Sequence, residues 1–260
     1  MPPKQRLDIL LVERGLAASR EKARAMIMAG EVSVDGRLVD KPGVQIPYRA
    51  ELTAKNKPRF VSRGGEKLAG ALQAFNLDVT DRICADVGAS TGGFTDCLLQ
   101  NGAAHVYAID VGYGQLDYGL RQDKRVTVLE RTNARYVESL ERLVNFVTLD
   151  ASFISLKLLL PVIKGWLKSS QFVIPLINPQ FEAGKQDVGK GGVVKDHNIH
   201  VRVVEEILSF GVQEGFTVSG LTLSPLKGPA GNIEFLAWLK WGNGQKESLP
   251  IPPLIQAIMG

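Results

Sequence analysis

The stretch that decides the fold of this chain is Asp86-Val87-Gly88-Ala89-Ser90-Thr91-Gly92-Gly93-Phe94-Thr95-Asp96. It follows an apolar run, Ile83–Val87, and opens a helical pattern, Gly92–Gln100. A glycine-rich loop between a buried strand and a helix is typical of a ligand-binding turn at the edge of a parallel sheet. We expect Gly88 and Gly92 to let the backbone approach a ligand, and Gly93 to let the helix pack against the strand. The predicted cofactor-binding residues of this loop are Asp86, Gly88, Ser90, Gly92, Gly93 and Phe94.

Two other interpretations of this loop have to be compared with a cofactor site. A phosphate-binding loop would end in Lys-Ser or Lys-Thr, which is missing here, and Asp86 would repel a phosphate. A carboxylate at that position instead suits a positively charged methionyl group. A plain tight turn without a ligand is the structural alternative.

A second acidic residue narrows the choice of cofactor. Asp110 follows the next apolar strand, about 20 residues after the loop, where an acid suits hydrogen bonding to ribose hydroxyls. This position fits both NAD and S-adenosylmethionine. The loop spacing Gly-x-x-x-Gly-Gly differs from the Gly-x-Gly-x-x-Gly of a dinucleotide site and favours S-adenosylmethionine. Asn133, beyond the third strand, either faces the adenine or is a turn residue, and the sequence leaves both open.

The rest of the second part of the chain alternates strands with helices. This alternation predicts an α/β fold with a parallel, Rossmann-like sheet covered on both faces. Thr217–Leu223 and Glu234–Lys240 are separated by only a turn, which predicts a final antiparallel pair. Three prolines, Pro250, Pro252 and Pro253, predict an extended C-terminal tail. The other expected strands are 105–111, 126–130, 146–150 and 172–177, with a helix at 154–164.

The first residues have a different pattern, which predicts a small α+β unit. A short helix around Leu7–Leu11 should end at Gly15, and Ser19 should cap a second helix that Gly30 ends. The run 32–39 alternates apolar and polar residues around Asp35-Gly36, which is a hairpin signal. We therefore predict two domains, residues 1–58 and 59–260.

Charge is concentrated in the first part of the chain. Residues 1–67 hold 14 basic and 8 acidic residues, whereas the whole chain has a net charge of +4. The helix and hairpin should present one basic surface, with Arg20, Lys22, Arg24 and Arg37 as candidate RNA-binding residues. A solvated basic face without a partner is the alternative.

Other sequence features limit the cellular context. Charged residues interrupt the apolar stretch near the N-terminus, and no apolar run is long enough to cross a bilayer, so we expect a cytoplasmic protein. Cys84 and Cys97 lie in apolar patterns and are expected to be buried free thiols. The three histidines form no zinc signature, so no metal site is predicted.

Two resemblances to known families extend these expectations. Residues 5–55, with the run Gly30-Glu31-Val32-Ser33-Val34-Asp35-Gly36, resemble the alpha-L RNA-binding domain of a small-subunit ribosomal protein and of pseudouridine synthases. That resemblance implies recognition of RNA backbone and shape.

Almost the whole chain resembles the TlyA, or hemolysin A, family. The matching strings are 61–68, the glycine-rich loop, 150–156, 179–185 and 231–235. The family joins the small RNA-binding domain to an FtsJ-like methyltransferase domain that uses S-adenosyl-L-methionine. The resemblance therefore implies 2′-O-ribose methylation of ribosomal RNA, with ribosomal RNA or ribosomal subunits as partners.

The family resemblance also implies a Lys-Asp-Lys-Glu catalytic tetrad. Lys67 matches its first position, Asp150 its second and Glu234 its fourth, and Asp150 is also expected at the cofactor. Asn178 stands where the third position requires a lysine. A cation that stabilises a developing alkoxide is typically worth ~3–4 kcal/mol, so its loss would slow the reaction roughly 100-fold.

Three functions remain compatible with an asparagine at position 178. In the first, methylation continues, with Lys185 or Lys190 from the glycine-rich segment 184–192 reaching the site. The loop 185–195, which holds three lysines, either is disordered or closes over RNA phosphates, and Arg63 is a further candidate RNA contact. In the second, the protein binds RNA and cofactor with little turnover. In the third, it permeabilises membranes as a hemolysin, although no amphipathic anchor supports this.

Overall fold

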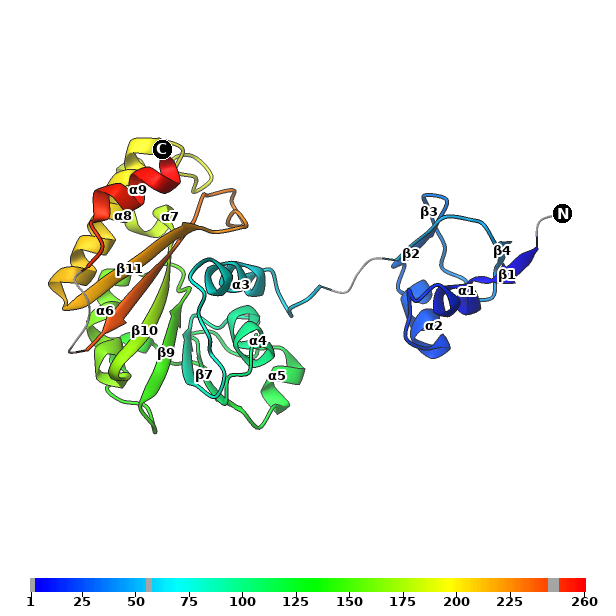
Figure 1. Cartoon of the computed structure of the whole chain (residues 1–260), viewed down its shortest axis with the longest axis horizontal. Helices are drawn as coiled ribbons and strands as arrows, with labels where there is room; N and C mark the ends of the chain where they lie inside the picture. The colour runs from blue at the N-terminus through cyan, green and yellow to red at the C-terminus, as the bar shows by residue number, and fades with distance from the viewer. Residues whose placement is uncertain (1–2, 55–57, 243–247) are drawn as a thin grey trace. The chain divides into compact units, whose positions relative to one another are not determined.

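A computed structural model of the chain describes residues 3–54, 58–242 and 248–260. The chain forms two compact units, Met1–Lys57 and Pro58–Gly260 (Figure 1). The smaller unit contains two short helices, a three-stranded sheet with strand order β3-β2-β5, and a separate pair of strands, β1 and β4. Its elements are β1 (Lys4–Arg6), α1 (Leu7–Glu13), α2 (Arg20–Met28), β2 (Val32–Val34), β3 (Arg37–Leu38), β4 (Gln45–Pro47) and β5 (Leu52–Ala54).

The helix cap, the glycines that end the helices and the hairpin turn of the smaller unit lie where the sequence predicts them. The Ser19 hydroxyl accepts a hydrogen bond from the Lys22 amide at the start of α2. Gly15 and Gly30 follow the two helices in left-handed conformations, with φ of 70° and 68°. Asp35 and Gly36 form the turn between the antiparallel strands β2 and β3. The predicted helix pair and hairpin are confirmed.

The larger unit is built on a seven-stranded sheet with strand order β11-β12-β10-β9-β6-β7-β8. Strand β12 pairs antiparallel with both of its neighbours, and the other pairings are parallel. This confirms the Rossmann-like sheet, with β12 as its antiparallel strand. The strands are β6 (Ile83–Val87), β7 (His105–Ile109), β8 (Val126–Leu129), β9 (Val144–Leu149), β10 (Leu167–Ile177), β11 (Phe216–Leu223) and β12 (Phe235–Trp241).

Helices cover both faces of this sheet, as Figure 1 shows. On one face, α3 (Gly64–Ala74), α4 (Gly93–Gln100) and α5 (Tyr118–Gln122) contribute to one apolar core. On the other face, α6 (Leu156–Ile163) and α8 (His197–Gln213) contribute to a second core. Strands buried on both faces carry near-continuous apolar runs, which explains why the sequence pattern identifies them. The short elements are η1 (Ala134–Tyr136), η2 (Lys164–Trp166), α7 (Pro179–Glu182) and η3 (Lys185–Asp187).

The predicted extended C-terminal tail is wrong in its described part. Residues Ile251–Met259 form helix α9, and residues 243–247 lie outside the described residues. Pro252 and Pro253 fall in the first helical turn, where no backbone N–H is needed for a helical hydrogen bond, so they permit the helix. Ile255 is buried in the same core as α8, which supplies the energy that holds the helix in place.

The order of the strands positions the functional edge of the sheet. From β6 the chain moves outward to β7 and β8, whereas β9 and β10 lie on the other side of β6. Ligands bind at such a reversal, at the carboxyl ends of the strands. Val87 and Leu149 are register partners, and the Asp150 amide donates to the Val87 carbonyl at 2.9 Å. Asp150 therefore lies beside the start of the glycine-rich loop.

Candidate active site

Two cavities meet at this edge of the sheet. The strand-end cleft has a volume of about 620 Å³ and is lined by the loops after β6, β7, β8 and β9. The lysine pocket has a volume of about 480 Å³ and includes Lys67 and Lys227 in its lining. Gly88, Ser90 and Asp150 line both cavities. A molecule in the cleft and a molecule in the pocket would therefore meet at Asp150.

The glycines of the loop serve mainly the packing of the chain. Gly88 has a φ of +85°, and a Cβ there would lie 2.3 Å from the Asp150 carbonyl oxygen. A Cβ on Gly92 would lie 2.3 Å from the Leu120 side chain, and one on Gly93 would lie 2.3 Å from the Ser62 hydroxyl oxygen. The Leu120 and Leu116 side chains fill the space beside Gly92, and Ser62 and the start of α3 fill that beside Gly93, so both glycines allow close packing. Their contact with a cofactor stays a prediction. Phe94 and Gly93 line the lysine pocket rather than the cleft.

Asp86 is fully buried and lines neither cavity. Its two carboxyl oxygens accept hydrogen bonds from the hydroxyls of Thr95 at 2.7 Å and Thr148 at 3.0 Å. The expected contact of this carboxylate with a methionyl group is therefore wrong. The side chain instead ties β6 to α4 and β9 beneath the loop.

Burial raises the pKa of Asp86 to about 6, although the hydrogen bonds from Thr95 and Thr148 oppose the shift. The folded protein therefore holds this proton more tightly than the unfolded chain, and the Asp86 contribution to stability falls as pH rises from about 4 to about 6. We predict that Asp86→Asn flattens this part of the stability curve. Urea unfolding of wild type and variant at several pH values measures the difference, and parallel curves would contradict the assignment.

Asp110 and Ser90 form the outer wall of the strand-end cleft. The Asp110 carboxylate accepts hydrogen bonds from the Ser90 amide at 2.8 Å and from the Gly112 amide at 2.6 Å. These two bonds fix its orientation at the end of β7. Asn133 also lines the cleft, and its side-chain oxygen accepts from the Arg135 amide at the start of η1. Asn133 is thus a turn residue at the wall of the cleft, and its contact with an adenine stays a prediction.

The residues matched to the tetrad come together in space. Lys67 of α3 and Glu234 are both buried and form an ion pair with a distance of 2.5 Å between Nζ and Oε2. The Asn178 amide donates to Glu234 Oε1 at 3.1 Å, and its oxygen accepts from the Gln180 amide at the start of α7. Glu234 lies directly before β12, where a side chain can be exposed, but here it is buried. Its burial raises its pKa, and the bond from Lys67 opposes this.

The Asp150 carboxylate has fewer hydrogen-bond partners than the Glu234 carboxylate. Among the described residues, no side-chain or backbone donor makes a hydrogen bond to its carboxylate. Burial raises its pKa, and the positive charge of Lys67 lowers it in part. The side chain is only half-buried and lines both cavities, so its carboxylate is open to a molecule bound in either one. Asp150 is therefore placed to accept a hydrogen bond from a bound molecule.

The cations around the lysine pocket differ from the expected set. Lys185 and Lys190 are exposed and line neither cavity. Arg63, one of the expected RNA contacts, lines the lysine pocket together with Lys227, which the sequence does not predict. Sequence reasoning misses Lys227 because its loop, between β11 and β12, carries no motif of its own. Its only sequence signal is its position seven residues before Glu234.

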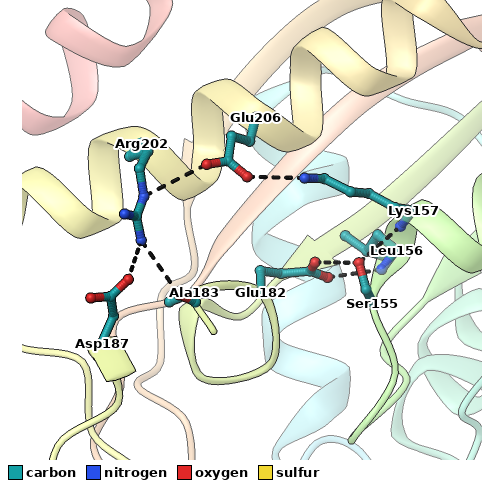
Figure 2. A network of polar contacts seen from close by, with 8 residues as sticks. All are labelled: Ser155, Leu156, Lys157, Glu182, Ala183, Asp187, Arg202 and Glu206. Atoms are coloured by element: carbon teal, nitrogen blue, oxygen red, sulfur yellow. Dashed lines mark hydrogen bonds and ion pairs between the residues drawn. The ribbon is translucent and has the colours of Figure 1, made fainter. Parts of the chain in front are cut away.

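A polar network fixes the segments that follow Asp150 and Asn178 (Figure 2). The Glu182 carboxylate accepts from the Ser155 hydroxyl at 2.6 Å and from the Leu156 amide at 2.8 Å. Arg202 of α8 forms an ion pair with Asp187 and donates to the Ala183 carbonyl. The first turn of α6, all of α7 and the segment after it are thus held together. The Asn232 side chain also donates to the Gly192 carbonyl and accepts from the Val194 amide, which ties the loop 185–195 to the segment before β12.

The basic residues of the smaller unit are exposed, but they are not equivalent. Lys22, Arg24 and Arg37 have exposed side chains with no ion pair among the described residues. Arg20 is half exposed and its Nε lies 2.9 Å from the buried Asp8 carboxylate. Arg6 is the other partner of Asp8 and holds the pKa of that carboxyl at about 2. Arg20 is therefore partly a structural residue.

Two known protein families match this chain, one in each unit. The sequence profile of the FtsJ-like methyltransferases matches residues 60–241, which include both cavities. The chain belongs to the FtsJ-like methyltransferase family. The profile of the S4 domain matches residues 5–47, within the smaller unit.

Relatives of this family member cover nearly its whole length. A Bacillus subtilis protein, named "Putative rRNA methyltransferase YqxC", is 50% identical over 98% of this chain and 93% of its own. The 16S/23S rRNA (cytidine-2′-O)-methyltransferase TlyA of Mycobacterium tuberculosis is 47% identical over 92% of this chain and 91% of its own. A solved structure named "Putative hemolysin from Streptococcus thermophilus" is 46% identical, covers 99% of this chain and 96% of its own, and has a TM-score of 0.74.

More distant structures share the fold of the FtsJ-like unit. One example is a structure from Listeria monocytogenes, named as an S-adenosylmethionine-dependent methyltransferase, with 18% identity and a TM-score of 0.53. It covers 70% of this chain and all of its own.

The described residues also show the state of the cysteines and whether a membrane span or a metal site is present. Cys84 and Cys97 are free and buried, as expected. In this part of the chain no helix is long and apolar enough to cross a bilayer, and no group of three His, Cys, Asp or Glu side chains could hold a metal ion.

Proposed function

We propose that this protein transfers the methyl group of S-adenosylmethionine to a ribose 2′-hydroxyl of ribosomal RNA. The observation that carries the proposal is the meeting of the strand-end cleft and the lysine pocket at Asp150. The first cavity suits a nucleoside with a cationic tail, and the second surrounds an acid with cations. The relatives named as ribosomal RNA methyltransferases support the same chemistry.

The residues of the strand-end cleft fit this cofactor. Its volume falls within the usual range for small-molecule sites. Asp110 offers a fixed carboxylate for ribose hydroxyls, and Asn133 lies across the cleft where an adenine could be contacted. The Asp150 carboxylate, which lines both cavities, offers negative charge for a cationic centre. When bound, the cofactor would supply a methyl group made electrophilic by the sulfonium.

The remaining chemistry belongs to the side chains of the lysine pocket. A ribose hydroxyl in the pocket can donate to Asp150, which has no other donor among the described residues and can hold the departing proton. Lys67 is kept in position by its ion pair with Glu234 and provides positive charge near the developing oxyanion. Most of the rate enhancement would come from holding the two reactants in one geometry.

Methyl incorporation into purified ribosomal subunits tests this proposal. The protein is incubated with methyl-labelled S-adenosylmethionine and subunits, and the RNA is digested to nucleosides. The proposal expects the label in a 2′-O-methylnucleoside. Label on a base, or no label with either subunit, would overturn it.

A second candidate function has one observation in its favour. Asn178 contributes no charge where the tetrad pattern has a lysine, so the protein could bind RNA and cofactor with little turnover. Subunit binding without incorporation of the label would support that function. Neither this alternative nor membrane permeabilisation is better supported by the comparisons than methyl transfer.

We further propose that the smaller unit, matched by the S4 profile, supplies affinity for ribosomal RNA. Exposed Lys22, Arg24 and Arg37 would contact phosphates, which release counterions when they are neutralised. Binding of ribosomal RNA should therefore weaken steeply as salt rises. The triple change of these residues to Gln should reduce the slope of log affinity against log salt by roughly 2 to 3.

Filter binding at several salt concentrations measures that slope. Lys124→Gln, which removes an exposed lysine of the larger unit, is the matched control and should leave the slope unchanged. An affinity that stays flat with salt would contradict the basic-surface proposal. Because ribosomes are the proposed substrate, we propose that the protein acts in the cytoplasm.

A further inference from the structure

At the four tetrad positions beside the lysine pocket, negative charge exceeds positive charge. Lys67 is the pocket's one buried cation among the described residues, and this cation is already paired with Glu234. Asp150 adds a second carboxyl, whereas Asn178 adds only a neutral amide. Three charged groups thus give one positive and two negative charges when both acids are ionised. A negative charge developing on a ribose oxygen would be poorly stabilised in this environment.

Lys227 enters the same pocket from the loop between β11 and β12. It lines the cavity together with Lys67 and Asp150. Its side chain is exposed, and no ion pair involves it among the described residues. Its ammonium is therefore available to the pocket, with a long stem that can follow a substrate.

The backbone around Lys227 is held at the tetrad residues. Gly228 packs directly on the Glu234 carboxylate, because a Cβ there would lie 2.5 Å from Glu234 Oε1. The Gly228 amide also donates to the Asn232 carbonyl at 2.9 Å. On the other side, Arg63 donates to the Lys227 carbonyl at 3.2 Å. Lys227 is thus anchored one residue away from the glycine that contacts the buried acid, and Arg63 acts as a positioning residue.

From this geometry we infer that Lys227 supplies the cation that the site lacks at Asn178. The inference rests on the proposed 2′-O-methyl transfer. The hydroxyl proton passes to Asp150, and the ribose oxygen forms its bond to the methyl carbon. The carbon–sulfur bond breaks with its electron pair on sulfur. Lys227 keeps its proton throughout and stabilises the negative charge on the oxygen.

Steady-state methylation of ribosomal subunits tests the inference with four proteins: wild type, Lys227→Gln, Asn178→Lys and the double variant. Lys227→Gln should lower kcat roughly 100-fold with little change in the KM for RNA, because charge stabilisation acts in the transition state. Lys227→Arg keeps the charge and should retain more activity than Lys227→Gln. Asn178→Lys should restore much of the lost kcat in the double variant but add little to wild type. Lys124→Gln is the matched control for the loss of an exposed lysine and should keep the wild-type kcat.

The possible outcomes distinguish failure of the inference about Lys227 from failure of the proposed function. Wild-type kcat in Lys227→Gln would overturn the inference. A raised KM with unchanged kcat would also overturn it, since Lys227 would then be an RNA phosphate contact only. Failure of wild type to methylate either subunit would instead remove the proposed function itself. Because the Lys227 side chain is exposed, Lys227→Gln should fold normally, and thermal melting checks this.

Discussion

Replacing Asp150 with asparagine should lower the rate of methyl transfer by roughly 10³-fold, because one change removes the acceptor at which both cavities meet. Asparagine has nearly the same shape, so the walls of both cavities should persist. It cannot hold the ribose proton, and it offers no negative charge to a cationic centre in the cleft. The effect should fall on kcat and on cofactor affinity together.

Stability should change little in this variant or should increase. Burial raises the pKa of Asp150, so the folded protein carries an ionised group that its environment disfavours at neutral pH. Asp81→Asn is a suitable control, because Asp81 is exposed in the same unit and asparagine tolerates its left-handed backbone. Single-turnover methylation of ribosomal subunits measures the rate, and a loss of less than about 10-fold would contradict the role given to Asp150.

Gly88→Ala should destabilise the larger unit by about 2–4 kcal/mol, since two costs add at this position. Its φ of +85° is strained for any residue with a Cβ. The new Cβ would also lie 2.3 Å from the Asp150 carbonyl oxygen and 2.9 Å from the Ala151 Cα. Backbone atoms cannot move aside as a flexible side chain can. The ends of β6 and β9 would have to separate, so cofactor binding should be lost as well.

Gly114→Ala is a control that separates the cost of backbone strain from the cost of the steric clash in Gly88→Ala. Gly114 also has a positive φ, +69°, but no atom lies within 4 Å of the position that its Cβ would take. It should lose only about 1–2 kcal/mol from backbone strain. Urea unfolding of both variants measures the difference. Equal losses would show that the close approach of Gly88 to Asp150 contributes nothing to stability.

The sheet is predictable because its signals are local and repeated. Apolar strands alternate with helical patterns, and each parallel strand is buried on both faces, so the sequence period is clear. Helix α9 is not predictable from the same kind of pattern. Pro250 before it and the two prolines in its first turn favour an extended chain locally, and the burial of Ile255 in the core overrides that preference.

Parts of the site depend on contacts that no local pattern encodes. The loop pattern assigns its acid to the cofactor, yet Asp86 is buried against Thr95 of the same stretch and Thr148 of the distant strand β9. The same pattern does not show that α5 and the segment before α3 fill the space beside Gly92 and Gly93. Lys227 escapes prediction for the same reason, since only the fold brings its loop to Lys67 and Asp150.

Calorimetric titration of the protein with S-adenosylmethionine tests the central claim most directly. The account predicts a saturable, single-site heat that weakens strongly in Asp110→Ala, which removes the fixed carboxylate of the cleft. NAD, which the loop spacing disfavours, should give no such heat. No heat with S-adenosylmethionine, or equal heats with both compounds, would contradict the account.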